Sequence, residues 1–458
     1  MRPPVQSLRL LSVSRFRPAV FADPLEGFLL MRPRNPCHAY IGHAGTGVAL
    51  AGVGAVWRGS FCGPRRFGEM RDASDALLAG CHALGDVGAP FAGPHFFAAC
   101  TFDGIPGRDM PAPATLFLPR WQLVRSPGGA TVVANLLVPR DGPPDAFLPG
   151  LEASLDAFEA RAGGAHGGCA LRVPSGAAPT LTEHAPGWYP RAVARVLGEI
   201  ASGRVQKVVL ARAWRAVHPE GFDFAHALRF LCARHPESHA YAFGDGVRGT
   251  FFGATPECLA SLVPGSHLRT DALAGTAPRD PDATADARGV EFLLRDEKER
   301  REHALVVLHL RHALARTLRL ELPAAPPPRV LTLPHLHHLH TPLCVPAPGT
   351  LHLCEVAAAL HPTPATAGYP VPLALRSIRE LEPVPRGLYA GGLGWFDATG
   401  GGRFLVALRS AQLSADGREA WLHAGSGIVE GSSFEREGAE IHAKLRTLAG
   451  ALQIPGAG

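Results

Sequence analysis

The sequence contains very little lysine. Only three of its 45 basic residues are lysines, namely Lys207, Lys298 and Lys444, and the rest are arginines. Arginine stays charged at any ordinary pH, whereas a buried lysine can lose its proton and act as a base. A lysine retained in so arginine-rich a chain therefore indicates a position where arginine would not serve.

Long apolar runs and a strong excess of charge are also missing. The most apolar stretch, residues 45–57, is shorter than the roughly 20 residues that a helix needs to cross a bilayer. It predicts two short core strands and a turn. The net charge of +5 over 458 residues is too small to indicate a nucleic-acid partner, but it is compatible with an anionic small molecule. We therefore expect neither a membrane span nor nucleic-acid binding.

Paired cysteines are absent as well. The nine cysteines are scattered, odd in number and without C-x-x-C spacing. In a chain of this length this pattern indicates reduced thiols and a cytoplasmic location rather than a disulfide framework. The hydrophobic fraction of 46% is typical of a folded globular protein.

The chain divides into two regions that differ in composition and in the elements their patterns predict. Residues 1–180 contain short strand-like runs between Pro- and Gly-rich turns, whereas residues 188–448 alternate clear helices with strands and carry most of the distinctive polar residues. The Gly/Ala/Pro-rich stretch that ends near residue 180 could be either a domain boundary or a long surface loop. Because strands cluster without regular β–α–β alternation, we expect an α+β fold with a large, mainly antiparallel sheet.

Periodicity and turn residues give the expected elements. The predicted strands are 8–13, 114–118, 131–138, 206–217, 239–243, 249–253, 258–263, 388–397 and 404–414, the last two forming a hairpin. The predicted helices are 145–161, 189–202, 287–320, 351–359 and 434–449.

Two residues of the second region are candidates for proton transfer. Lys207 lies among apolar strand residues, where loss of hydration would lower its pKa and free the amine as a base. Glu257 follows a Thr-Pro turn next to two phenylalanines, where it could stay protonated and act as an acid. Taken alone, each is as compatible with a solvated strand-edge lysine or a turn glutamate.

Two Glu-x-x-Glu pairs could form a metal site. Glu299 and Glu302 share one helical face, and Glu437 and Glu440 share another. If these faces meet, they form an all-oxygen site suited to Mg²⁺. The alternative is two solvated helix faces. Lys444, one turn after Glu440, could meet a substrate carboxylate or pair with Glu440.

Glycine and histidine form further clusters. The runs 273–276 (LAGT) and 423–427 (HAGSG) could let backbone N–H groups approach an anion, although neither is a nucleotide-binding motif. His335, His337, His338 and His340 suggest zinc, but their spacing fits no usual structural zinc pattern. A histidine that lines a substrate site is the better interpretation.

Ordered motifs in the second region resemble the chorismate-utilising enzymes and, within them, the isochorismate synthases. The motifs are KVVLAR (207–212), FGATPE (252–257), LAGTAPR (273–279), EKERREH (297–303), HLHT (338–341), HPTPA (361–365), RGLYAGGLGW (386–395), VALRSA (406–411), AGSGIVEGS (424–432) and E-x-x-E-x-x-x-K (437–444). Residues 1–180 match the family only weakly. In that family both halves form one α+β domain with the site in a cleft, so the resemblance implies a single domain over 1–458.

The resemblance also implies a reaction and its residues. Water adds at C2 of chorismate while the C4 hydroxyl leaves and the double bonds shift. Lys207 is implied as the base, Glu257 as the acid, and Mg²⁺ as the cofactor, held by Glu302 and Glu440 with Glu299 and Glu437 in water-mediated roles. The implied substrate-binding residues are Gly275, Thr276, His338, Ala365, Arg409, Gly425 and Lys444.

The same motifs separate the relatives within the family. Anthranilate synthases generally carry Gln in place of Lys207, and aminodeoxychorismate synthases carry a nucleophilic Lys in place of Ala274, so both are disfavoured. Salicylate synthases, which also eliminate pyruvate, remain the alternative, although HPTPATAG (361–368) looks like the isomerase. Two residues depart from the family pattern: Glu299 stands where Asp is usual, and Ala277 stands where Arg is usual.

Other classes of function remain open at this stage. A non-catalytic metal-binding module would use the histidines of residues 335–340, and an enzyme-like fold without activity is a further possibility. Members of the family are often monomers, but the sequence itself leaves the oligomeric state open, together with whether the product enters menaquinone or siderophore synthesis.

Overall fold

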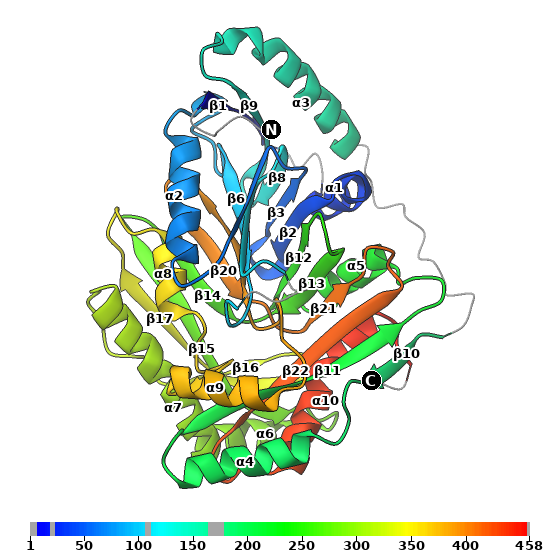
Figure 1. The fold of residues 1–458 in the computed structure, drawn as a ribbon, viewed down its shortest axis with the longest axis vertical. Coiled ribbons are helices and arrows are strands. Elements are labelled where there is room, and N and C mark those ends of the chain that lie inside the picture. Colours follow the sequence, from blue (N-terminus) through cyan, green and yellow to red (C-terminus); the bar gives the residue numbers. More distant parts are fainter. Residues whose placement is uncertain (1–6, 19–22, 106–110, 164–177, 456–458) are drawn as a thin grey trace.

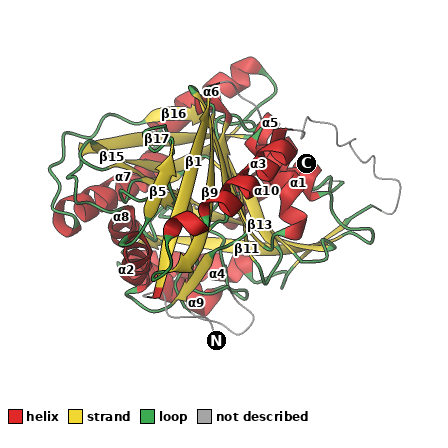
Figure 2. Cartoon of the chain, turned by 90° about the horizontal axis from the view of Figure 1, so that it is seen from above, coloured by secondary structure: helices red, strands yellow, loops and turns green. Residues whose placement is uncertain are grey.

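The computed structural model describes residues 7–18, 23–105, 111–163 and 178–455. Two large β-sheets face each other at its centre, and helices cover their outer faces (Figures 1 and 2). Every strand pair is antiparallel except β1 with β5. The expected α+β fold with mainly antiparallel sheets is therefore confirmed.

The larger sheet has thirteen strands within the described ranges. Their spatial order is β10 (Thr180–Glu183), β11 (Lys207–Val217), β22 (Glu419–Ile428), β21 (Ser410–Leu413), β13 (Thr250–Thr255), β12 (His239–Asp245), β2 (Cys37–His43), β3 (Val48–Val53), β8 (Trp121–Ser126), β9 (Gly129–Pro139), β1 (Leu8–Arg17) and β5 (His82–Gly85), with β18 (Gly368–Tyr369) beside β11.

The smaller sheet has nine strands in the same ranges. Their spatial order is β16 (Arg329–Thr332), β17 (Leu336–Pro346), β15 (His267–Pro278), β14 (Cys258–Val263), β20 (Gly402–Val406), β19 (Gly392–Asp397), β6 (His95–Cys100), β7 (Ala114–Leu118) and β4 (Trp57–Phe61). The predicted strands 114–118 and 258–263 match their observed bounds.

Three apolar layers hold the sheets and helices together. The layer between the sheets joins aromatic and aliphatic residues of both, such as Phe97, Phe117 and Phe243. The outer face of the larger sheet packs on α1 (Pro24–Met31), α3 (Leu148–Gly163), α4 (Tyr189–Ala201), α5 (Phe224–Arg234), α9 (Val371–Leu381) and α10 (Phe434–Ala451). The outer face of the smaller sheet packs on α2 (Arg66–Leu78), α6 (Ala283–Arg295), α7 (Glu297–His312) and α8 (Leu353–Leu360). The result is a four-layer arrangement of helices, sheet, sheet and helices.

Each sheet contains strands from both regions of the sequence, which meet at one strand pair in each sheet. In the larger sheet β2 pairs with β12, with His43 opposite His239. In the smaller sheet β6 pairs with β19, with Cys100 opposite Gly392. The loose stretch before residue 180 falls mostly on residues 164–177, which lie outside the described residues.

The single helix predicted for residues 287–320 is wrong. The chain forms α6 and α7, which meet at Asp296. Asp296 has an extended backbone, with ψ of 126°, and its side chain accepts a hydrogen bond from the N–H of Glu299, so it starts a new helix. A π-helical turn, Ala313–Thr317, ends the tract. The break places Glu299 in the first turn of α7.

The strand predicted for residues 404–414 is also wrong. Residues 392–406 form the expected hairpin of β19 and β20, but β21 begins only at Ser410 and belongs to the larger sheet. Residues 407–409 carry the chain from one sheet to the other. Arg409, the last of these three residues, has a left-handed backbone with φ of 48°, which interrupts the extended chain before β21 begins.

Two further findings concern thiols and membrane helices. The eight cysteines within the described residues are all free, and Cys169 lies outside them. Over the same residues, no helix combines the length and the apolar character that a transmembrane span requires.

Candidate active site

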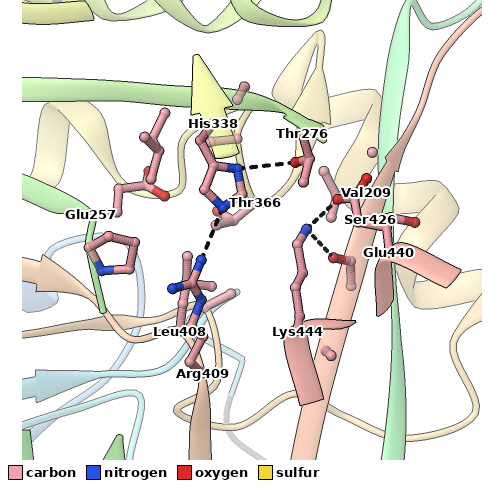
Figure 3. A pocket seen from close by; sticks show the side chains of 18 of the residues that line it. Val209, Glu257, Thr276, His338, Thr366, Leu408, Arg409, Ser426, Glu440 and Lys444 are labelled. Carbon is pink, nitrogen blue, oxygen red and sulfur yellow. Dashed lines mark hydrogen bonds and ion pairs between the residues drawn. The ribbon is translucent and has the colours of Figure 1, made fainter. Parts of the chain in front are cut away.

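A cavity with an empty volume of about 740 Å³ gathers most of the predicted site residues (Figure 3). The predicted residues that line it are Glu257, Gly275, Thr276, Glu302, His338, Ala365, Arg409, Gly425, Glu440 and Lys444. Three predicted residues, Lys207, Glu299 and Glu437, lie behind this lining. The cavity therefore unites residues that are up to 187 positions apart in the sequence.

Two crossings between the sheets form one wall of the cavity. The chain leaves the larger sheet at residues 256–257, after β13, and returns at residues 407–409, before β21. The N–H of Val406 donates to the carbonyl of Glu257 at 3.1 Å, and the N–H of Ala254 donates to the carbonyl of Arg409 at 3.2 Å. The crossings thus lie side by side, and each brings one functional side chain to the cavity.

Glu257 is buried on the first crossing, with 2% of its surface exposed. Burial raises the pKa of its carboxyl to about 8, although the cations Lys207, Lys444 and Arg409 act in the opposite direction. The side chain is therefore largely protonated at neutral pH. This agrees with the sequence-based expectation of a carboxylic acid that can donate a proton.

Arg409 faces the same space from the second crossing. Its Nη2 donates to Nε2 of His338 at 3.0 Å, and burial lowers the pKa of the guanidinium to about 10. Among the described residues no carboxylate forms an ion pair with it. Burial and the neighbouring guanidinium lower the pKa of His338, so this imidazole is neutral. A buried cation next to a neutral ring can receive an anion from outside the protein.

Lys207 is fully buried at the start of β11. Its Nζ lies 2.9 Å from Oε1 of Glu302, and Glu302 lines the cavity. Gly427 makes this arrangement possible, because a Cβ at that position would lie 2.5 Å from Oε1 of Glu302 and 2.9 Å from Cε of Lys207. The interpretation of Lys207 as a solvated strand-edge lysine is therefore wrong.

Lys444 projects into the cavity from α10. Its Nζ donates to Glu440 one turn earlier and, at 2.8 Å, to the carbonyl oxygen of Gly425 on β22. The predicted alternative of a Lys444–Glu440 pair is thus confirmed. The ammonium also ties α10 to the strand that forms the opposite wall.

Glu299 and Glu437 border a neighbouring cavity on the outer side of the same helices. Lys298 lies between them, with Nζ 3.0 Å from Oε1 of Glu299 and 2.9 Å from Oε1 of Glu437. Burial and the nearby Glu302 raise the pKa of Glu299 to about 7, and burial and Glu440 raise the pKa of Glu437. The two Glu-x-x-Glu faces therefore do turn toward each other, with a lysine between the outer pair.

The two glycine-rich runs are parts of strands and not anion-binding loops. Residues 423–427 lie inside β22, and residues 273–276 lie inside β15. Gly275 sits at an irregularity of β15 with φ of 81°, which favours glycine. This irregularity lets the N–H of Thr276 donate to Oε2 of Glu299 at 2.8 Å.

The histidine cluster is distributed over both faces of β17. His337 lies 2.9 Å from Asp286, and His340 lies 2.9 Å from Asp271, whereas His338 contacts Arg409 and Thr276. Side chains alternate along a strand, so neighbouring histidines point to opposite faces. Of this group, His338 lines the cavity.

Sequence reasoning assigned no role to five polar residues of the lining: Thr366, Arg386, Tyr389, His423 and Ser426. Arg386 is buried against Glu382, and it donates to the carbonyls of Thr366 and Val209 at 2.7 and 2.8 Å. The ring of Tyr389 stacks on His423, with centroids 5.2 Å apart. Arg386 and Tyr389 stand in the motif RGLYAGGLGW, which carried the only sequence signal for them.

The sequence matches known proteins along most of its length. The sequence profile of the family described as chorismate binding enzyme covers residues 6–453. The isochorismate synthase DhbC of Bacillus subtilis is 38% identical over 277 residues, which is 58% of this chain and 68% of that protein. EntC of Escherichia coli, also an isochorismate synthase, is 36% identical over 57% of this chain and 66% of that protein. A salicylate biosynthesis isochorismate synthase of Pseudomonas aeruginosa is 41% identical over 58% and 54%. The alignments thus span between about half and two thirds of these relatives.

Solved structures share the fold over nearly the whole chain. The menaquinone-specific isochorismate synthase MenF of Escherichia coli has a TM-score of 0.72 and 25% identity, covering 96% of this chain and 94% of that one. Anthranilate synthase component I of Streptococcus pneumoniae has a TM-score of 0.69 over 88% and 92%, and at 21% identity it supports the fold alone. The chain belongs to the family of chorismate-binding enzymes.

Proposed function

We propose that this chain is an isochorismate synthase, which interconverts chorismate and isochorismate. The observation that carries the proposal is the gathering of a protonated glutamate, an unpaired guanidinium and two glutamate–lysine pairs around one cavity: Glu257, Arg409, Glu302 with Lys207, and Glu440 with Lys444. An anionic ring can be held there while one of its hydroxyl groups is protonated. The printed activities of the most similar relatives support the same reaction.

The proposed reaction replaces a hydroxyl at C4 by one at C2. Lys207 removes a proton from a water molecule, and the water oxygen bonds to C2. The C1–C2 double bond moves to C1–C6, and the C5–C6 double bond moves to C4–C5. The C4–O bond breaks as Glu257 donates its proton, and the hydroxyl leaves as water. Atoms and charge balance, because one water enters and one leaves.

The remaining predicted residues would bind and orient the substrate. Arg409 and the backbone near Gly425 would hold the enolpyruvyl carboxylate, and Lys444 would contact a carboxylate near the metal. His338 keeps Arg409 in position through its neutral Nε2. Gly275, Thr276 and Ala365 would shape the wall around the ring.

The carboxylates of this site fit Mg²⁺. Glu302 and Glu440 line one cavity, and the raised pKa values of Glu299 and Glu437 reflect an excess of buried negative charge that a divalent cation would relieve. Over the described ranges no three side chains of His, Cys, Asp or Glu converge tightly enough to hold a metal by themselves. Mg²⁺ commonly binds one or two carboxylates and takes its other ligands from water and substrate. When bound, it would neutralise the ring carboxylate, with Glu302 and Glu440 as its ligands.

We further infer that residues 1–458 form a single domain. The pairing of β2 with β12 and of β6 with β19 supports this, because each of these pairs joins strands of the two regions into one continuous sheet. The resemblance to the family favours a monomer, and this state stays a prediction.

Chromatography of the products formed from chorismate tests the proposed function. Purified protein with Mg²⁺ is expected to form isochorismate until equilibrium, and EDTA is expected to stop the reaction. Accumulation of salicylate and pyruvate would instead identify a salicylate synthase. Lack of any turnover with Mg²⁺ would contradict both.

A further inference from the structure

His423 is a half-buried residue of the cavity that the proposed reaction leaves without a role. It lines the cavity, and its Nε2 is buried without a hydrogen-bond partner among the described residues. Buried polar atoms of native proteins are nearly always satisfied, so an exception inside a ligand cavity calls for a ligand atom. Arg386, its charged neighbour, is already bound to Glu382 and two carbonyls.

The position of His423 on β22 relates it to the rest of the site. Alternate residues of a strand share a face, so His423, Gly425 and Gly427 lie on the same face of β22. Gly427 adjoins Glu302 and Lys207, and Gly425 adjoins the hydroxyl of Tyr389, to which a Cβ would come within 3.3 Å. From residue 423 to residue 427 the strand rises about 13 Å. His423 therefore stands at the end of the cavity opposite the glutamates.

The ring of His423 is fixed and neutral. It stacks on Tyr389 at an interplanar angle of 16°, which leaves it little freedom to turn. Burial and the nearby Arg386 lower the pKa of His423 to about 3. A neutral imidazole carries one N–H, which can donate to an anion without adding a second buried charge.

We propose that His423 recognises the enolpyruvyl side chain of the substrate, donating Nε2–H to its carboxylate while Tyr389 holds the ring. This inference rests on the proposed function and adds a substrate contact to it. With Arg409 on the second sheet crossing and His423 on β22, the side-chain carboxylate is bound from two elements. The enolpyruvyl end is thereby distinguished from the ring carboxylate at the glutamate end.

A comparison of two ligands tests this contact. His423→Phe keeps the size and the stacking but removes both nitrogens. We expect its KM and Kd for chorismate to rise about tenfold, as for a lost hydrogen bond to a charged group. The Kd for trans-3,4-dihydroxycyclohexa-1,5-diene carboxylate, which lacks the enolpyruvyl group, should equal that of the parent. His423→Gln keeps a donor and should lie closer to the parent than His423→Phe.

A matched control is His95→Phe. His95 is a buried histidine that also has an unpartnered Nε2, but it lies on β6 and does not line the cavity. Its replacement should leave both ligand affinities unchanged. Equal weakening of both ligands by His423→Phe, or no weakening of either, would overturn the proposal. A parent protein that binds chorismate but forms no isochorismate would refute the proposed function instead, and the Kd comparison would still test His423.

Discussion

The two regions of the sequence contribute to the molecule in different ways. Residues 1–180 supply the strands β1 to β9. Most of their buried side chains are apolar, as in the layer between the two sheets. Every residue that lines the main cavity falls between positions 209 and 444. One region thus completes the sheets, and the other carries the proposed chemistry.

The difference is clearest where the chain crosses between the sheets. In the second region it crosses between the sheets at Glu257 and again at Arg409, and the two crossings are hydrogen-bonded to each other. A crossing must leave the regular ladder, so it can direct a polar side chain into the space between elements. The first region also changes sheets, for example at residues 54–56 and 119–120, but no residue of these crossings lines the cavity. We therefore expect substitutions in the two regions to separate activity from stability.

The largest expected effect is the loss of activity in Glu257→Gln. The amide has the size of the acid but cannot donate a proton to the leaving hydroxyl, so kcat should fall about a thousandfold. The melting temperature should stay close to that of the parent, because the buried carboxyl is largely neutral already. Steady-state kinetics and thermal unfolding measure the two. Glu291→Gln, on the exposed side of α6, is the control and should change neither.

The opposite result is expected for Phe117→Ala in the first region. Phe117 is fully buried between the sheets, where it stacks on Phe97. Truncation should lower the free energy of unfolding by about 3–5 kcal/mol. Below the unfolding transition kcat should be unchanged, and Phe117→Leu should lose much less stability. A large fall in kcat for the folded variant would contradict the division between the regions.

A smaller loss of stability is expected when Lys298 is replaced, because this lysine lies between two glutamates next to the proposed metal site. Lys298→Met leaves the buried carboxylates of Glu299 and Glu437 without their shared cation. Unfolding should become easier by about 2 kcal/mol, and added Mg²⁺ should restore part of the loss. Thermal unfolding with and without Mg²⁺ measures this. An unchanged melting temperature in EDTA would show that the lysine is dispensable for holding α7 and α10 together.

The smallest effect is on the pH profile. The acid Glu257 must be protonated, and its pKa of about 8 is raised above the usual value. The rate should therefore fall about tenfold between pH 7 and pH 9 as the carboxyl loses its proton. The residual activity of Glu257→Gln should lack this decline. A profile that rises through pH 8 would contradict the assignment of Glu257 as the acid.

Much of the fold could be predicted from local patterns. Strands such as 114–118 and 258–263 stand out because apolar runs are bounded by Gly, Pro or polar turns. The split at Asp296 was missed, since helical residues continue on both sides and only the capping side chain marks the break. The strand 404–414 was overextended because an apolar run does not show a change of sheet.

The site was predictable where a residue had an unusual type or a motif. Lysine scarcity and the family resemblance identified Lys207, Glu257 and the four glutamates. The glycines of residues 423–427 were interpreted as a place where backbone N–H groups approach an anion, whereas at Gly427 the close approach of Glu302 requires a glycine. Tyr389 and His423 were missed, because an aromatic ring and a histidine in apolar strands look like core residues until their neighbours are known.

The origin of the new hydroxyl tests the central claim most directly. When the protein converts chorismate in water enriched in ¹⁸O, mass spectrometry of isochorismate should show one ¹⁸O atom, located at C2. That result shows that the new hydroxyl comes from water and that the C4 hydroxyl leaves, which the roles given to Lys207 and Glu257 require. Isochorismate that retains the original hydroxyl oxygen would contradict the mechanism and the roles given to both residues.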